Sequence, residues 1–244
     1  MKQYADRDRW KGKGSWAIDL PANFTITPNG GFRWDDYLTD PVMGAGVSEA
    51  GLVNDHSWNA GVDLAWSMNQ TAAFYVSYNY ESGYRQVYER DTTPDLNMES
   101  KDKTHTFIVG TKITLIPDKL KLNANYTFVR STSSWTSSCT AYGCRYTPLA
   151  TFPDAHNTLN RFDVQAKYLF DKDFTRNVGW VGQAYIKARV LWEKDYSDNW
   201  QPLSQQLGYD VNPGNTTTRR AIFLATGNPD YNVVVGMLSF GVKW

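Results

Sequence analysis

The sequence has 244 residues, and its 25 Lys and Arg balance its 25 Asp and Glu, so the formal net charge at pH 7 is zero. This balance gives no support to a nucleic-acid partner or to a polybasic membrane-surface patch. No window approaches 18 consecutive apolar residues, which excludes a transmembrane helix. A mean hydropathy of −0.52 still allows a transmembrane strand, because such a strand shows lipid only every second side chain.

The first nine residues have no apolar core and no small-residue cleavage site, so they are not a secretory signal. Exported proteins are made with such a signal. We therefore expect the sequence to be either a mature form or a part cut from a longer precursor. The composition is unusual in its aromatic residues, with 15 Tyr, 11 Phe and 10 Trp.

Alternation of apolar and polar residues predicts nine strands. The first two are irregular: residues 13–20 carry Trp16, Ile18 and Leu20, and residues 24–37 contain Pro28 and Gly30-Gly31, which predict a bulge or bend. The other seven are regular and cover residues 57–68, 71–81, 105–115, 120–128, 162–170, 184–192 and 234–244. In the first of these seven, Trp58, Ala60, Val62, Leu64, Trp66 and Met68 share one face, and polar or small residues share the other.

A soluble β-sandwich also has alternating strands, but three features favour a transmembrane barrel. The strands reach about 10–14 residues, whereas globular strands average about 5–6. Short connections near Asn23, Asn69 and Asp118 alternate with long ones at 38–55, 90–101, 134–157 and 198–230, as periplasmic turns and outer loops do. Tryptophans also form two belts: Trp66, Trp180 and Trp244 lie at the short-turn ends, and Trp34, Trp58 and Trp192 at the long-loop ends.

We therefore predict an all-β fold, an antiparallel transmembrane β-barrel, with residues 1–244 forming one barrel segment in the bacterial outer membrane. If the C-terminus is periplasmic, nine strands place the start of the first strand outside. A complete barrel with an even strand number begins and ends on the same side. The parity thus predicts the C-terminal part of a larger barrel, unless a strand is missed or spurious near the irregular N-terminal region.

Ionisable residues of both signs follow the polar alternation. On the lipid face each Lys or Arg would cost about 2–4 kcal/mol at the midplane, so we expect these side chains to face the lumen. The candidate lumenal and partner-contacting residues are Asp63, Glu81, Lys112, Lys121, Arg161, Asp163, Lys167, Lys187, Arg189 and Glu193, with Asp19, Arg33, Asp35 and Lys243 on the same alternation. They suit either the wet wall of an open pore or a wall that pairs with a protein plug. Mixed sign argues mildly against a charge-selective porin.

Cys139 and Cys144 are the only cysteines, and a disulfide that closes an outer loop is the favoured interpretation. Their spacing does not fit Cys-x-x-Cys-His haem attachment, and too few ligands surround them for a zinc site. No nucleophile elbow, phosphate loop or His-Glu-x-x-His motif is present, so we expect no enzyme and no bound metal.

Few other residues are candidates for a catalytic site or a cation site. His105, on the lipid-facing alternation, and His156, in a predicted loop beside Asp154, are the only candidates for a catalytic dyad. Asp35-Asp36, Asp195 and Asp198 are acidic groups of predicted loops, and we interpret them as solvated carboxylates rather than cation ligands.

Short motifs along most of the chain resemble the C-terminal part of the MtrB/PioB family of outer-membrane barrels, which accompany multihaem c-type cytochromes. In chain order they are Tyr-Ala-Asp-Arg-Asp-Arg at 4–9, Trp-Asp-Asp-Tyr at 34–37, Thr-His-Thr at 104–106, Leu-Ile-Pro-Asp-Lys-Leu at 115–120, Asn-Tyr-Thr at 125–127, Asn-Thr-Leu-Asn-Arg at 157–161, Tyr-Ser-Asp-Asn-Trp at 196–200 and Gly-Asn-Pro-Asp-Tyr at 227–231. The turn at 116–120 and the segment at 229–231 are the most specific. Family members are much longer, so the chain is either a fragment or a short member.

The resemblance implies a sheath that performs no redox chemistry itself. Such a barrel surrounds a periplasm-facing multihaem c-type cytochrome, whose haem chain carries electrons across the outer membrane, often toward an outer-surface multihaem cytochrome. The absence of Cys-x-x-Cys-His agrees with haem being held by the partner and not by this chain. The alternative function is a passive porin or substrate channel with an open polar lumen.

Overall fold

The structure is a computed structural model that describes residues 7–37, 49–69, 71–90, 96–139, 153–171, 182–198, 208–210, 219–221 and 230–243. In these ranges a short 3-10 helix, η1 (Pro21–Asn23), is the one helical element. The strands are β1 (Arg7–Ser15), β2 (Ile18–Leu20), β3 (Phe24–Tyr37), β4 (Glu49–Ser67), β5 (Ala72–Arg90), β6 (Leu96–Ile116), β7 (Leu120–Cys139), β8 (Ala155–Leu169), β9 (Gln183–Asp198), β10 (Gly208–Asp210), β11 (Arg219–Ala221) and β12 (Tyr231–Lys243).

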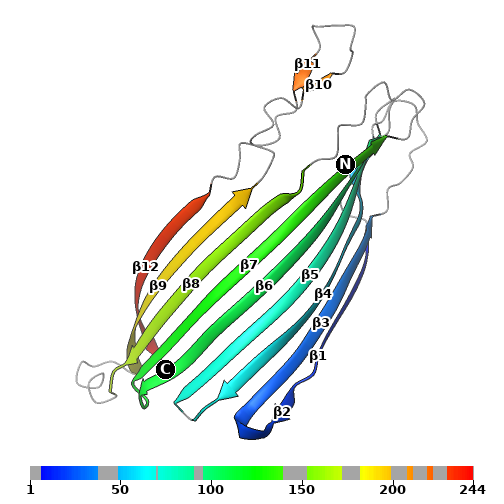
Figure 1. Cartoon of the computed structure of the whole chain (residues 1–244). Coiled ribbons are helices and arrows are strands. Elements are labelled where there is room, and N and C mark those ends of the chain that lie inside the picture. The colour runs from blue at the N-terminus through cyan, green and yellow to red at the C-terminus, as the bar shows by residue number, and fades with distance from the viewer. Residues whose placement is uncertain are drawn as a thin grey trace.

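Ten strands form one antiparallel sheet that is curved and strongly tilted (Figure 1). Its order is β1-β3-β4-β5-β6-β7-β8-β9-β12, and β2 pairs with β3 below β1. Apart from β2, which also pairs with β3, and the separate β10–β11 pair, each strand pairs with the next one in the sequence. The strands β1 and β12 form the two edges of a sheet that is not closed within the described residues. The all-β antiparallel prediction is confirmed, and the nine positions across the sheet match the nine predicted strands. No helix among the described residues has the length and apolar character needed to cross a membrane.

The predicted short connections are tight turns with a local cause. Asn69 Oδ1 accepts hydrogen bonds from the backbone N–H groups of Thr71 (2.9 Å) and Ala72 (2.8 Å), which closes the turn from β4 to β5. Asp118 adopts a φ of 58° in the turn from β6 to β7, a left-handed conformation that Asp tolerates better than most residues. The Lys119 N–H then donates to the Ile116 carbonyl at 3.1 Å.

The strands are longer at the other end than the sequence predicted. β4 begins at Glu49, β5 continues to Arg90, and β6 begins at Leu96, so residues assigned to long loops belong to the sheet. The last predicted loop, 198–230, also contains the β10–β11 hairpin. Beyond the lipid both faces of a strand can be wet, so the apolar alternation ends before the backbone pairing does. Alternation therefore marks the lipid-embedded part of a strand and not its end.

The first predicted strand begins at Arg7, six residues before the predicted start, and it is interrupted at Trp16 and Ala17 between β1 and β2. Pro28 of β3 lies opposite this break and has no N–H to donate, although its carbonyl accepts from the Trp16 N–H at 3.0 Å. Of the bulge or bend predicted within 24–37, the bulge is wrong, because β3 keeps one register with β4 over residues 24–36. The interruption falls on the partner strand instead.

The stagger of the apolar band gives the tilt of the strands. Trp58 of β4 and Trp192 of β9 end the band on their strands, but the β9 residue in register with Trp58 is Asp198, six residues beyond Trp192. With about 3.4 Å per residue and about 4.8 Å per strand, six residues over five strand steps correspond to a tilt of about 40°. Transmembrane barrels tilt their strands by about 35–45°, so the chain has barrel geometry.

Candidate functional site

Register divides the sheet into an apolar and a polar face. One cross-strand row of the apolar face runs from β3 to β12 through Ile26, Leu64, Val76, Val109, Tyr126, Phe162, Trp192 and Val234. A nearby row of the polar face runs through Thr27, Asp63, Ser77, Ile108, Thr127, Arg161, Glu193 and Val233. The separation holds across eight strands, so the two faces meet different surroundings.

Stacked aromatic rings border the apolar face at both ends. At the long-loop end His56 stacks between Trp34 (ring centroids 4.3 Å apart) and Tyr84 (4.7 Å). At the turn end Trp66 stacks between Phe24 (5.4 Å) and Phe74 (5.8 Å). His56 and Trp66 are ten residues apart on β4, which at this tilt separates the belts by about 26 Å, close to the roughly 25 Å apolar band of outer-membrane barrels. Trp180 and Trp244 of the predicted belts lie outside the described residues.

The polar face contains all ten candidate residues. Asp63 and Glu81 lie on β4 and β5, Lys112 on β6, Lys121 on β7, Arg161, Asp163 and Lys167 on β8, and Lys187, Arg189 and Glu193 on β9. The structure brings several of them into contact, as described next. Their contact with a partner stays a prediction.

The β8–β9 part of the polar face forms an internal ion-pair network. The Arg189 guanidinium donates to both carboxylate oxygens of Asp163, at 2.8 and 2.5 Å. Arg161 lies 3.6 Å from Glu193, which also accepts from the Tyr231 hydroxyl of β12. These carboxylates are therefore matched to arginines of neighbouring strands. Asp63 is matched differently, since it accepts hydrogen bonds from Ser77 and from the Asn29 amide.

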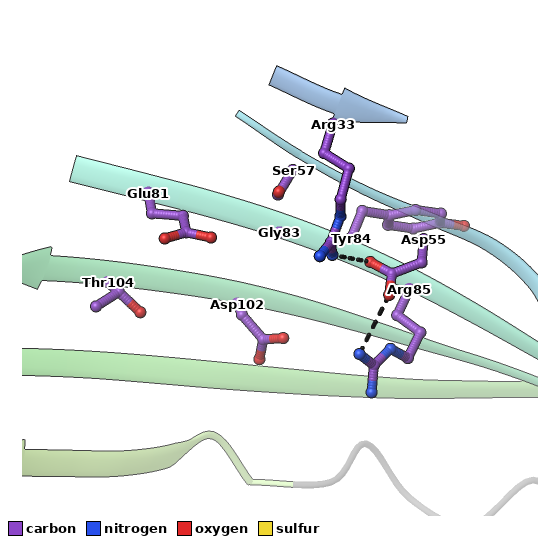
Figure 2. Close-up of a pocket in the computed structure, with 9 residues that line it drawn as sticks. All are labelled: Arg33, Asp55, Ser57, Glu81, Gly83, Tyr84, Arg85, Asp102 and Thr104. Atoms are coloured by element: carbon purple, nitrogen blue, oxygen red, sulfur yellow. Dashed lines mark hydrogen bonds and ion pairs between the residues drawn. The ribbon is translucent and has the colours of Figure 1, made fainter. Parts of the chain in front are cut away.

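A second network ties β1, β3, β4 and β5 together at the long-loop end. Arg9 donates twice to Asp35, at 2.6 and 2.7 Å, and the Asp35 side chain is 1% exposed. Asp55 accepts from Arg33 at 2.8 Å and from Arg85 at 3.2 Å, and these two pairs are drawn in Figure 2. Bidentate arginine–carboxylate pairs are among the strongest charge-assisted contacts, so this network fixes the mouth of the polar face.

A cavity of about 200 Å³ opens beside the second network (Figure 2). It is lined by Arg33, Asp55, Ser57, Glu81, Gly83, Tyr84, Arg85, Asp102 and Thr104. Sequence analysis assigned Arg33 and Glu81 to the polar alternation but did not identify Asp55 and Arg85 of the cavity or Arg9 of the network beside it. Continuing the polar alternation of each strand beyond its last apolar residue would have found Asp55 and Arg85.

The structure corrects the loop assignments of Asp35 and His156. Asp35 is not a solvated loop carboxylate: it is buried in β3 against Arg9, because the β1–β3 pairing sets the two residues opposite each other. His156 belongs to β8 and not to a loop, and its Nδ1 lies 3.1 Å from the Thr132 hydroxyl. His105 lies on the apolar face as predicted, with its Nδ1 2.8 Å from the Tyr78 hydroxyl.

Asp195 and Asp198 also belong to a strand, β9, and not to a loop. Among the described residues, no group of three or more His, Cys, Asp or Glu is placed to hold a metal ion. The predicted Cys139–Cys144 disulfide involves side chains outside the described part of the chain.

A tilted antiparallel sheet with one apolar face, two aromatic belts and tight turns at one end defines an outer-membrane β-barrel protein. Over residues 1–244 the sequence matches the MtrB/PioB family of outer-membrane β-barrel porins, and the chain belongs to this family. The protein is thus an outer-membrane protein. Because charges on a lipid face are costly, we expect its polar face to be the lumenal face.

The fold resembles BauA, the ferric preacinetobactin receptor from Acinetobacter baumannii, with a TM-score of 0.53 and 12% identity over 99% of this chain and 38% of BauA. The chain thus spans well under half the length of that barrel protein. The β domain of the Bordetella autotransporter BrkA has a TM-score of 0.42 and 11% identity, over 79% of this chain and 71% of that domain. A comparison with curated proteins finds no match.

Proposed function

We propose that this barrel holds a multihaem c-type cytochrome in its lumen and supports electron transfer across the outer membrane, without binding haem itself. The observation that carries the proposal is an apolar stripe on the lumenal face. Val233, Val235 and Met237 of β12 lie on this face and are 39%, 37% and 44% exposed, and Leu191 of β9 pairs with Val235. A water-filled pore gains nothing from such a stripe, whereas a protein plug can bury it.

The charges of the lumenal face support the same proposal. Ion pairs within the wall, such as Arg189–Asp163, present a surface of low local net charge that a folded protein can approach. Serine, threonine and asparagine side chains between them offer hydrogen bonds to a partner. The partner that we propose, from what the resemblance to the MtrB/PioB family implies, is a periplasmic multihaem c-type cytochrome, with an outer-surface multihaem cytochrome as a further partner.

The test is purification of the protein from its native outer membrane in mild detergent. We expect a haem-bearing protein in a fixed ratio to the barrel, measured by the Soret absorbance. Val235→Gln, which places a polar group in the stripe, should lower this ratio. Ser239→Gln, on the same strand and face, serves as the matched control.

A second measurement distinguishes the sheath from an open pore, the alternative that the porin description of the family favours. Proteoliposomes that contain the native complex should transfer electrons from an external reductant to an entrapped dye and conduct ions poorly. A barrel that carries no haem protein and conducts ions in planar bilayers would show that the sheath proposal is wrong.

A further inference from the structure

Three lysines occupy directly opposed positions on neighbouring strands of the lumenal face. Lys121 of β7 pairs with Lys167 of β8, which pairs with Lys187 of β9. Lys112 of β6 lies diagonally beside Lys121, because the β6 residue opposite Lys121 is Thr114. Like charges directly opposite each other destabilise a sheet. These four residues, named here the lysine row, therefore lower the stability of the sheet when no partner is bound.

The lysine row makes no ion pair of its own with the wall carboxylates, although Lys187 is close enough to Asp163 for a longer-range attraction. On the same two strands, Asp163 is held by Arg189 at 2.5 Å and Glu193 by Arg161 at 3.6 Å. Among the described side chains, no ion pair joins any lysine of the row to a carboxylate. Arginines therefore form the ion pairs with Asp163 and Glu193, and none of the four lysines does.

The contacts that the row does make are with aromatic rings. Lys167 Nζ lies 3.9 Å from the centroid of the Tyr185 ring, and Lys112 Nζ lies 5.9 Å from that of Tyr75. Cation–π contacts of this kind hold an ammonium group without neutralising it. The rings therefore keep the charge of the row in the lumen.

The row lies near the turn end of the lumen, the periplasmic end of such barrels. Lys121 is next to Leu120, the first residue of β7, and Lys167 lies two residues before Leu169, the last residue of β8. Lys112 and Lys121 are exposed, and Lys167 and Lys187 are half-buried. From β6 to β9 the row spans three strand spacings, about 14 Å.

We propose that the lysine row is a docking site for an acidic polypeptide segment that enters the lumen from the periplasmic side. The inference rests on the proposed function, since it concerns how the lumenal wall meets its protein partner. Charge complementarity selects the occupant: one small anion can neutralise only one or two ammonium groups of a row about 14 Å long, whereas a segment with several carboxylates can neutralise all four. Ion pairs with the bound segment would then reduce the repulsion among the lysines.

A defined probe tests the site without the native partner. A fluorescein-labelled peptide of ten glutamates, titrated into the purified full chain, should bind with an affinity that falls as salt is raised. The double variant Lys121→Gln/Lys167→Gln should bind about tenfold more weakly, the order expected for the loss of two ion pairs. The matched control is Lys101→Gln/Lys103→Gln, an equal loss of charge at exposed positions on the other face of β6, which should leave the affinity within about twofold.

Stability gives an independent measurement. Removal of opposed charges should raise the denaturant midpoint of the Lys121→Gln/Lys167→Gln variant, and the glutamate peptide should raise the midpoint of the unchanged protein. Equal peptide affinity of the row variant and the unchanged protein would overturn the proposal. Displacement of the peptide by inorganic phosphate at equal charge concentration would also overturn it, in favour of a small-anion site.

The outcomes separate this inference from the proposed function. If the row variant and the unchanged protein carry the haem partner at the same ratio, and neither binds the peptide, the docking proposal is wrong and the sheath proposal stands. If the row binds the peptide but the barrel never carries a haem protein, the docking proposal stands and the cytochrome proposal is wrong.

Discussion

Substitution of Val109 by arginine tests the assignment of the two faces, because its neighbour Ile108 provides a matched control. Both residues lie in the middle of β6, about four residues from His105 at one end of the band and from Ile113 at the other. At the observed tilt this places them about 10 Å from each belt. Val109 is on the apolar face, assigned to lipid, and Ile108 is on the polar face, assigned to the lumen. The two variants therefore make nearly the same chemical change at the same depth.

The expected cost in folding free energy is larger for Val109→Arg than for Ile108→Arg, by about 1 kcal/mol or more. An arginine on the lipid face near the midplane costs about 2–4 kcal/mol, which lowers the folding equilibrium constant by roughly 30- to 1000-fold. At position 108 the arginine would lie between Ser77 and Thr127, on a face that already holds charged groups. We expect Ile108→Arg to cost about 1 kcal/mol or less, although it replaces an equally apolar residue.

The assay is equilibrium urea unfolding of the protein in phospholipid vesicles. Tryptophan fluorescence reports the loss of the belts, and the electrophoretic shift of unheated samples reports the folded barrel. A Val109→Arg variant as stable as the unchanged protein, or an Ile108→Arg variant destabilised by 2 kcal/mol or more, would refute the face assignment.

Three further predictions concern single contacts. A Cβ added at Gly110 would lie 2.3 Å from Cζ of the Tyr75 ring, so Gly110→Ala should cost about 1–3 kcal/mol, and a double-mutant cycle with Tyr75→Ala should recover part of this cost. Asp35→Asn, which removes a buried acceptor from the arginines around it, should lower the free energy of unfolding by about 1.5–3 kcal/mol, measured in the same urea titration. The hydrogen bond to Asp171 raises the pKa of Lys119 in the β6–β7 turn, so its contribution to stability is complete below the ordinary lysine value of 10.5 and is lost as pH rises through the higher folded value. Asp171→Asn should abolish this loss between pH 10 and 12, and a variant that keeps the loss would contradict the assignment.

The sequence predicted the two faces because alternation is a local property of a strand. Successive side chains of an extended chain point to opposite sides whatever the strand pairs with, so Val62 and Asp63 could be assigned to different faces without any partner. The tight turns at Asn69 and Asp118 are also local, since they depend on side chains that accept nearby backbone N–H groups or tolerate a left-handed φ. Nine strand positions and the lipid band follow from these two signals.

The ends of the strands could not be predicted in the same way. Beyond the lipid the side chains of β4, β5 and β6 no longer need to alternate, and only backbone pairing extends them toward residues 49, 90 and 96. The prediction of a bulge near Pro28 was wrong for a related reason. A proline removes one hydrogen bond, and whether its own strand or the neighbouring strand is interrupted depends on which partner faces the missing N–H.

The register between neighbouring strands could be learned only from the tertiary structure. Lys121, Lys167 and Lys187 are 20 to 66 residues apart in the sequence, and alternation alone places them on one face without a position relative to one another. A shift of two residues in the β7–β8 pairing would keep every side chain on its face and yet separate Lys121 from Lys167. The same shift in the β1–β3 pairing would separate Arg9 from Asp35. The sequence by itself therefore determined which side chains share the apolar face and which share the polar face, and cross-strand pairing determined which charges of the polar face neutralise each other.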